Sequence, residues 1–252
     1  MVILETIAVA FSMYSAIPTP QFEWTEKNMK YALCAFPLIG VVIGFVCWAI
    51  AALCGVVGIP AIFQAALLCA APVLITGGIH LDGFADTSDA LASHADRQKK
   101  LEILSDPHVG SFAVIKICVY FIIMFAAWAS LRTFMPVPFI CSFCMSRVLS
   151  ALAVSAFPMA KKTGLAYTFA VSSERKRVCG ILIVADILLF AAMAIASLVG
   201  LFMALAAHLM FAVYYAISRR IFGGITGDLA GWFLTLAEMW MLIIAVITEI
   251  LI

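Results

Sequence analysis

The chain has 252 residues, of which 65% are hydrophobic and only 12% are charged, and its mean hydropathy is +1.15. A soluble domain carries about 25% charged residues, so this composition excludes a water-soluble core and predicts that most of the chain lies in a lipid bilayer. The net charge of +1 says nothing about nucleic acid, but no basic block and no interleaving of aromatic and basic residues indicates RNA or DNA, so we expect no nucleic acid partner.

Candidate membrane spans follow from the apolar runs, because a span needs about 20 apolar residues. Residues 3–17 are apolar but short, which favours a re-entrant or interfacial helix over a span. The 51-residue run 31–81 contains no Asp, Glu, Lys or Arg and is long enough for two spans that break near residues 55–60. The remaining candidate spans are 112–131, 136–158, 178–199, 201–218 and 229–251.

These runs predict the fold class and the domain organisation. We expect an all-α, polytopic integral membrane helix bundle with about six to eight membrane helices. Tight hairpins at residues 132–138 and around Gly200 would join successive spans. The whole chain, residues 1–252, then forms a single integral membrane domain, and a homo-oligomer is left open.

Basic residues predict which end of the bundle faces the cytoplasm. If each span crosses once, residues 18–30, 80–111, 159–177 and 219–228 fall on one side, and the hairpin tips fall on the other. The first side carries 12 lysines and arginines, whereas the second carries only Arg132. The positive-inside rule makes the first side cytoplasmic. We therefore predict a multi-pass protein of the cytoplasmic (inner) membrane whose polar loops converge at the cytoplasmic face.

Three carboxylates arrive within eight residues at the end of the longest apolar run. In a helix that continues from the first of them, Asp82, Asp86 and Asp89 lie at i, i+4 and i+7, on one face within about 60° of one another. Such close carboxylates repel each other unless a cation lies between them, and Mg²⁺ prefers carboxylates plus substrate phosphates. The pattern predicts a Mg²⁺ site for phosphoryl transfer, and Gly83 would let a substrate approach the backbone. The alternative is a solvated acidic face at a helix N-terminus.

A second polar cluster, residues 106–111, precedes the next span and adds Asp106 to the catalytic candidates. His80 and His108 flank the acidic region, and either could act as a general base. A lone histidine near an interface is more often structural. We include His80 among the catalytic candidates.

The last hydrophilic link contains the stretch GGITGDLAG, residues 223–231. Its glycines form a doubled GxxxG pattern, which by itself indicates close helix packing. Packing does not explain Thr226 and Asp228, because both are polar groups at the membrane surface. A glycine-rich turn with a hydroxyl and a carboxylate suits a diphosphate or a metal. We predict that Asp228 is a metal ligand, and that Thr226 and Gly227 contact the bound substrate.

Two ionisable residues lie deeper, each roughly 15 Å from the predicted cytoplasmic end at 1.5 Å per residue. They are Arg147 and Glu238. Charges at that depth are costly and either pair with each other or line a polar cavity. A structural Arg147–Glu238 pair and a substrate-binding role for Arg147 both remain open.

The segments TGGIHLDGFADTSDAL, KLEILSDPHVGSFAV and GGITGDLAG, in this order, resemble the cobalamin synthase family, adenosylcobinamide-GDP ribazoletransferase. The N-terminal IPTP followed by AFPLIGVVIG is also similar to that family, so the resemblance covers nearly the whole chain. It implies a Mg²⁺-dependent integral membrane enzyme. Such enzymes join α-ribazole, or its 5′-phosphate, to adenosylcobinamide-GDP and release GMP in the last steps of cobalamin synthesis. The resemblance implies these two substrates as partners and places the carboxylates at the reaction.

The chain departs from the family pattern at three places. An arginine expected before IPTP is absent from Tyr14-Ser15-Ala16-Ile17-Pro18, and Ala90 stands where a glycine is usual. The segment Asp106-Pro107-His108 replaces an Asp-Ser-Arg. The two lost arginines weaken any phosphate-binding role at those positions.

Two other functions would also gather carboxylates in a membrane protein. A CDP-alcohol phosphotransferase of phospholipid synthesis requires DGxxAR, but here DGFA is followed by Asp86-Thr87. A divalent-cation transporter would place its site near the middle of the membrane, whereas these acids cluster at the membrane rim.

Overall fold

The structure is a computed structural model that describes residues 2–252, and within that range it contains helices and no strand. From the N-terminus to the connection at residues 131–135, the elements are α1 (Val2–Tyr14), α2 (Glu26–Met29), α3 (Ala32–Val57), α4 (Ala61–Thr76), α5 (Ile79–Ala92), α6 (Arg97–Ile103) and α7 (Ser111–Ser130). The elements after this connection are α8 (Pro136–Ala156), α9 (Leu165–Ser172), α10 (Arg175–Ala196), α11 (Leu198–Ile217), the π-helix η1 (Ser218–Phe222) and α12 (Gly227–Leu251). The predicted all-α class is confirmed.

Six helices of the described chain are long and apolar enough to cross a membrane: α3, α7, α8, α10, α11 with η1, and α12. The helix pair α4 and α5 adds a bent seventh candidate. These numbers agree with the predicted range. The hairpin predicted around Gly200 lies slightly earlier, because Ser197 interrupts the helix and its side chain accepts a hydrogen bond from the Gly200 N–H at 2.9 Å.

Helix α8 forms the centre of the bundle. It packs against α3, α10, α11 and α12. Of the residues in its most apolar 18-residue stretch, 78% are buried, compared with 17% for the same length of α10. Helix α8 therefore contacts protein over most of its surface, whereas α10 presents most of its surface outward. Lipid would cover that outward surface.

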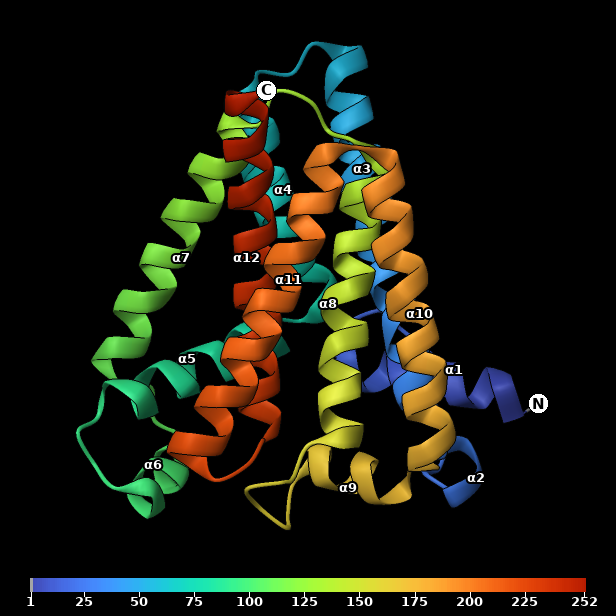
Figure 1. The fold of residues 1–252 in the computed structure, drawn as a ribbon, viewed down its shortest axis with the longest axis vertical. Coiled ribbons are helices and arrows are strands. Elements are labelled where there is room, and N and C mark those ends of the chain that lie inside the picture. Colours follow the sequence, from blue (N-terminus) through green and yellow to red (C-terminus); the bar gives the residue numbers. More distant parts are fainter. Residues whose placement is uncertain (1) are drawn as a thin grey trace.

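The connections predicted to share a side do lie at one end of the bundle (Figure 1). Helices α5, α6 and α9 and the π-helix η1 are at the lower end of that view, and the α3–α4, α7–α8 and α10–α11 connections are at the opposite end. The short helix α1 runs across the bundle near the lower end. At 13 residues it is too short to span a bilayer, so it stays a predicted interfacial or re-entrant helix.

Candidate active site

Helix α5 carries the three carboxylates because the chain turns sharply before it. Gly77 and Gly78 have φ values of 66° and 80°, a left-handed conformation that other residues rarely adopt. The turn sets α5 at 94° to α4, so α5 lies across the end of the bundle and does not continue the crossing. Asp82 and Asp89 both fall inside this one helix with Asp86 between them, which confirms the predicted helical continuation.

A close crossing of α5 with α12 brings a fourth carboxylate to this helix. A Cβ atom at Gly83 would lie 2.7 Å from the backbone oxygen of Asp228, so only glycine leaves room for α12 there. One turn further along α12, a Cβ at Gly231 would lie 3.0 Å from the carbonyl oxygen of His80. The Thr235 hydroxyl donates to that same oxygen at 3.2 Å. The packing interpretation of the glycines therefore holds for Gly231.

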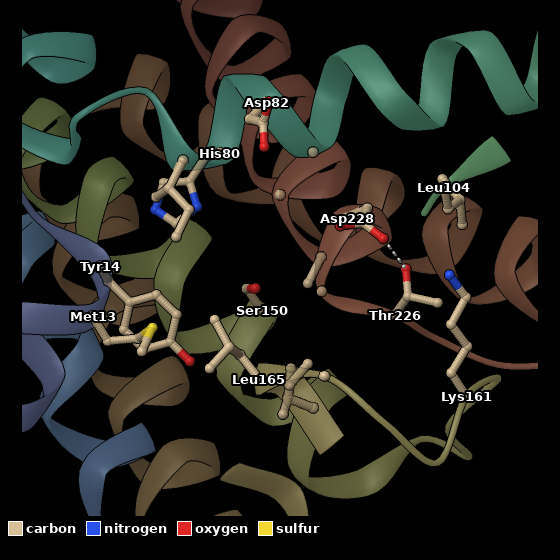
Figure 2. A pocket seen from close by; sticks show the side chains of 18 of the residues that line it. Met13, Tyr14, His80, Asp82, Leu104, Ser150, Lys161, Leu165, Thr226 and Asp228 are labelled. Carbon is tan, nitrogen blue, oxygen red and sulfur yellow. Dashed lines mark hydrogen bonds between the residues drawn. The ribbon is translucent and has the colours of Figure 1, made fainter. Parts of the chain in front are cut away.

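The turn before α12 orients Asp228. Thr226 is the N-cap of α12, and its side-chain oxygen accepts a hydrogen bond from the Leu229 N–H at 3.2 Å. The same hydroxyl lies 3.3 Å from Asp228 Oδ2 and donates to it (Figure 2). A Cβ at Gly227, by contrast, would meet no heavy atom closer than 3.6 Å, and the residue is exposed. It lines the cavity described below, so helix packing does not explain it.

A second loop, residues 158–161, is tied to this turn by backbone hydrogen bonds. Ala160 N–H donates to the Ile225 oxygen at 2.8 Å, and Ile225 N–H donates to the Pro158 oxygen at 2.9 Å. A Cβ at Gly224 would lie 2.5 Å from that Pro158 oxygen, so a glycine is required for the contact. The connection holds Lys161, the next residue, beside the turn that carries Asp228.

Lys161 is a site residue that sequence reasoning missed. By sequence, Lys161 counts only as one of the 12 basic residues on the predicted cytoplasmic side. No local pattern indicated that its loop would pack against the GGITGD turn. Its ammonium group donates a hydrogen bond to the Ser105 hydroxyl and points toward Asp228 (Figure 2). Its neighbour Lys162 is exposed and does not line the cavity.

These elements enclose a cavity of about 440 Å³ at the end of the bundle that carries α5 and α9. Six predicted site residues line it: His80, Asp82, Gly83, Thr226, Gly227 and Asp228. Lys161 and residues of α1, α3, α8 and α9 complete its walls. A cavity of this size matches small-molecule sites in general.

The carboxylates repel one another in the absence of a cation. Burial, together with the charges of Asp82, Asp228 and Asp89, raises the pKa of Asp86 to about 6, against the lowering effect of Lys161. Each additional negative charge therefore disfavours ionisation of Asp86. Within residues 2–252, however, no three His, Cys, Asp or Glu side chains are gathered into a ready-made metal site.

The donor set nevertheless fits a hard divalent cation. Asp82, Asp86 and Asp228 offer only carboxylate oxygens, the ligands that Mg²⁺ takes in proteins, and their mutual repulsion is what a cation would relieve. One or two protein carboxylates, with the other positions filled by water and phosphate oxygens, are typical of such sites. Asp82 and Asp228 line the cavity, whereas Asp86 lies one turn along α5 from Asp82 and outside the cavity lining. These three residues could hold the metal if their side chains converge on it.

Asp89 has a different environment from the other acids of α5. Its Oδ2 accepts a hydrogen bond from Gly110 N–H at 2.7 Å, and its Oδ1 accepts one from Ala113 N–H at 2.8 Å. Both groups lie at the N-terminus of α7, where unpaired N–H groups favour an anion. Asp89 thus caps α7, and its predicted role as a metal ligand remains a prediction.

Asp106 is exposed and lies outside the cavity lining. It accepts hydrogen bonds from the backbone N–H of His108 at 2.9 Å and from the His108 ring at 2.7 Å. These two bonds hold the pKa of Asp106 below its ordinary value. The cavity therefore gives no support to Asp106 as a catalytic residue.

His80 is half-buried between this cavity and a small one of about 30 Å³, and its Nε2 atom is fully buried. Burial and the nearby Arg147 charge lower its pKa to about 3, so the ring stays neutral. A neutral histidine with so low a pKa is a poor general base near pH 7. Its Nε2 has no hydrogen-bond partner within the described chain.

The deep charges form an ion pair. Arg147 Nη1 lies 2.6 Å from Glu238 Oε1 and donates to the Phe143 carbonyl at 2.8 Å. Arg147 is 1% exposed and lines only the small cavity. Of the two alternatives left open by the sequence, the structural pair is the one observed, and the main cavity does not support a substrate contact by Arg147.

Comparisons with known proteins extend over the whole chain. The family model described as Cobalamin-5-phosphate synthase matches residues 6–246. A protein of Lachnoclostridium phytofermentans named adenosylcobinamide-GDP ribazoletransferase is 40% identical over 250 residues, covering 98% of this chain and 95% of the relative. Relatives of the same name from Desulfitobacterium hafniense and Geobacillus kaustophilus are 31% and 32% identical, over 93% and 88% of this chain and 94% and 88% of their own. No solved structure matches.

Proposed function

The chain belongs to the cobalamin-5-phosphate synthase family, and we propose that it is an adenosylcobinamide-GDP ribazoletransferase. It would transfer the adenosylcobinamide phosphate of adenosylcobinamide-GDP to α-ribazole or α-ribazole 5′-phosphate and release GMP. The observation that carries this proposal is the similarity to named ribazoletransferases over nearly the full length of both chains. That similarity disfavours both the CDP-alcohol phosphotransferase and the cation transporter.

The reaction is a phosphoryl transfer with one bond made and one broken. The 3′-oxygen of the ribose attacks the phosphorus that carries the cobinamide, and the bond from that phosphorus to the bridging oxygen breaks. The bridging oxygen leaves with GMP, and the hydroxyl proton passes to a base at the site. Positioning and charge stabilisation supply most of the rate in such transfers.

The residues at the polar end of the cavity suit this chemistry. Lys161 would bind phosphate oxygens, since it is held beside Asp228 by the loop contact and bears a positive charge. Thr226 and the exposed backbone of Gly227 would contact the diphosphate. Asp82, Asp86 and Asp228 would hold Mg²⁺, which when bound neutralises phosphate charge and stabilises the departing GMP.

We further propose that the end of the bundle with the cavity faces the cytoplasm. The asymmetry of basic residues supports this orientation. In a cysteine-free background, single cysteines at Ser93 and Ser173 should resist a membrane-impermeant reagent in intact cells, and one at Thr133 should react. Labelling of the cysteine at position 93 or 173 from outside the cell would show that the orientation is the opposite of the one proposed.

Metal-dependent GMP release tests the proposed function. Purified protein in liposomes should release GMP from adenosylcobinamide-GDP only when α-ribazole and Mg²⁺ are both present. Asp228→Asn should insert normally and lose at least about 10²-fold in rate, the scale of one lost electrostatic contact, with any residual rate needing more Mg²⁺. A fully active Asp228→Asn enzyme with unchanged Mg²⁺ dependence would remove Asp228 from the site. Absence of GMP release by the wild type would reject the function itself.

A further inference from the structure

The cavity has two chemically different ends (Figure 2). One end carries Asp82, Asp228, Thr226 and Lys161. The other end is apolar and aromatic: Figure 2 shows Met13 and Tyr14 of α1 there, and Phe36 of α3 packs against Tyr14. The cavity also has apolar lining from Leu33 of α3, Val154 of α8 and Leu165 of α9. The rings of Tyr14 and Phe36 lie 4.4 Å apart between centroids. The reaction groups account for the first end and leave the second without an occupant.

The apolar end contains few hydrogen-bonding groups, and these are not engaged with one another. His80 Nε2 is fully buried and has no partner within the described chain. Of the residues drawn in Figure 2, only Thr226 and Asp228 are joined by a hydrogen bond, so the hydroxyls of Tyr14 and Ser150 make none to the others. A ligand here meets an apolar surface with a few available polar groups. That pattern is typical of a site that orients a mostly apolar molecule.

The reaction brings three bulky groups to the site, and their chemistry distinguishes them. A corrin macrocycle with its adenosyl group is too large for a cavity of about 440 Å³. Guanine carries donors and acceptors along two edges, and burying them unpaired is costly. The base of α-ribazole is a bicyclic aromatic ring with two methyl groups and one free acceptor nitrogen. An apolar, aromatic pocket with few polar groups matches that base and does not match guanine.

We propose that the apolar end of the cavity binds the dimethylbenzimidazole base of the acceptor nucleoside. The ribose then extends toward Asp82 and Asp228, so the 3′-hydroxyl meets the donor diphosphate at the polar end. The donor's guanosine and corrin ring lie outside the apolar end. This assignment rests on the proposed function and adds which substrate occupies which half of the cavity.

Steady-state kinetics in liposomes can test the assignment, with GMP release as the readout. Two acceptors are compared, α-ribazole and the riboside of unmethylated benzimidazole, each varied at saturating adenosylcobinamide-GDP. Burial of two methyl groups should make kcat/KM about tenfold higher for the dimethylated acceptor. Met13→Ala should reduce this preference, and Met210→Ala, a half-buried methionine that does not line the cavity, should preserve it.

A second variant adds a larger side chain to the apolar end of the cavity, whereas Met13→Ala removes one. Ser150→Leu should raise the KM for the dimethylated acceptor more than for the unmethylated one, while the donor KM and inhibition by GMP stay within about twofold of wild type. Retained GMP inhibition shows that the protein is folded, and if Ser150→Leu is not folded, Met13→Ala decides alone.

Three outcomes would overturn the assignment while leaving the function intact. Guanine occupies the apolar end if the variants raise the donor KM or weaken GMP inhibition and leave the acceptor KM unchanged. Neither base occupies it if Met13→Ala and Met210→Ala behave alike. A wild type without any preference between the two acceptors would likewise remove the dimethylated base from this end. A wild type that releases no GMP rejects the proposed function instead.

Discussion

Replacement of Gly83 by alanine is a direct test of how the two halves of the site are joined. The added Cβ would lie 2.7 Å from the Asp228 oxygen, against at least 3.4 Å for an ordinary contact, so α5 and the first turn of α12 must separate by about 0.7 Å. Overpacking of this kind costs about 1–3 kcal/mol, partly offset by the roughly 0.5–1 kcal/mol that alanine gains over glycine in a helix. Misplacement of a reacting group by about 1 Å costs about 10²-fold in rate. We therefore expect Gly83→Ala to lower kcat between about 10- and 100-fold with only modest loss of stability.

The assay is GMP release in liposomes beside thermal unfolding in detergent. Gly180→Ala is the matched control, because Gly180 also lies in a helix and a Cβ there meets no heavy atom within 4 Å. It should keep full activity and gain slightly in stability. Wild-type activity of Gly83→Ala would show that the α5–α12 contact does not position the carboxylates. An equal loss of activity in both variants would make the effect a general one of glycine replacement.

Three further predictions concern charges. Lys161→Met should lower kcat/KM by about 10²-fold, whereas Lys162→Met should change it less than about twofold; similar losses in the two variants would refute a phosphate contact by Lys161. Because the pKa of Asp86 is raised to about 6, its contribution to stability is present below its ordinary pKa and is lost as pH rises through 6. In EDTA the Tm should therefore fall mainly between about pH 4 and 6 and change little above pH 7, and Mg²⁺ should restore it at pH 7. A Tm equally pH-dependent in Asp86→Asn would contradict this origin. Glu238→Gln should destabilise the protein by about 3–5 kcal/mol, because it leaves the Arg147 charge buried without a partner. The double variant Arg147→Met/Glu238→Met should recover much of that loss. An equal free energy of unfolding in the single and double variants would argue against the pair.

Several features were determined by local sequence alone. A 51-residue run without charge has no stable place in water, so the membrane-helix class follows from composition. The i, i+4, i+7 spacing of Asp82, Asp86 and Asp89 needs only that one helix be continuous, and α5 is continuous over Ile79–Ala92. The motif order was sufficient to identify the family resemblance, which the comparisons confirm.

Other features depended on contacts between distant segments, which no local pattern specifies. Asp89 was expected to act with its two neighbours, but its oxygens meet N–H groups of α7 some 21 and 24 residues later in the chain. Lys161 joins the site through backbone bonds to a loop more than 60 residues away. Arg147 and Glu238 had two open interpretations, and only the packing of α8 against α12 distinguished them.

The division has a physical reason. Burial in lipid and helical periodicity act on neighbouring residues, so length, composition and spacing were enough to predict the helices and the face that carries the carboxylates. Which side chains share a cavity depends on how closely helices approach, and here that distance is set by single positions such as Gly83 against the Asp228 backbone and Gly224 against Pro158. The sequence alone thus determined a membrane-helix enzyme with an acidic helix, and the tertiary structure decided which of its polar residues line one cavity with an apolar and a charged end.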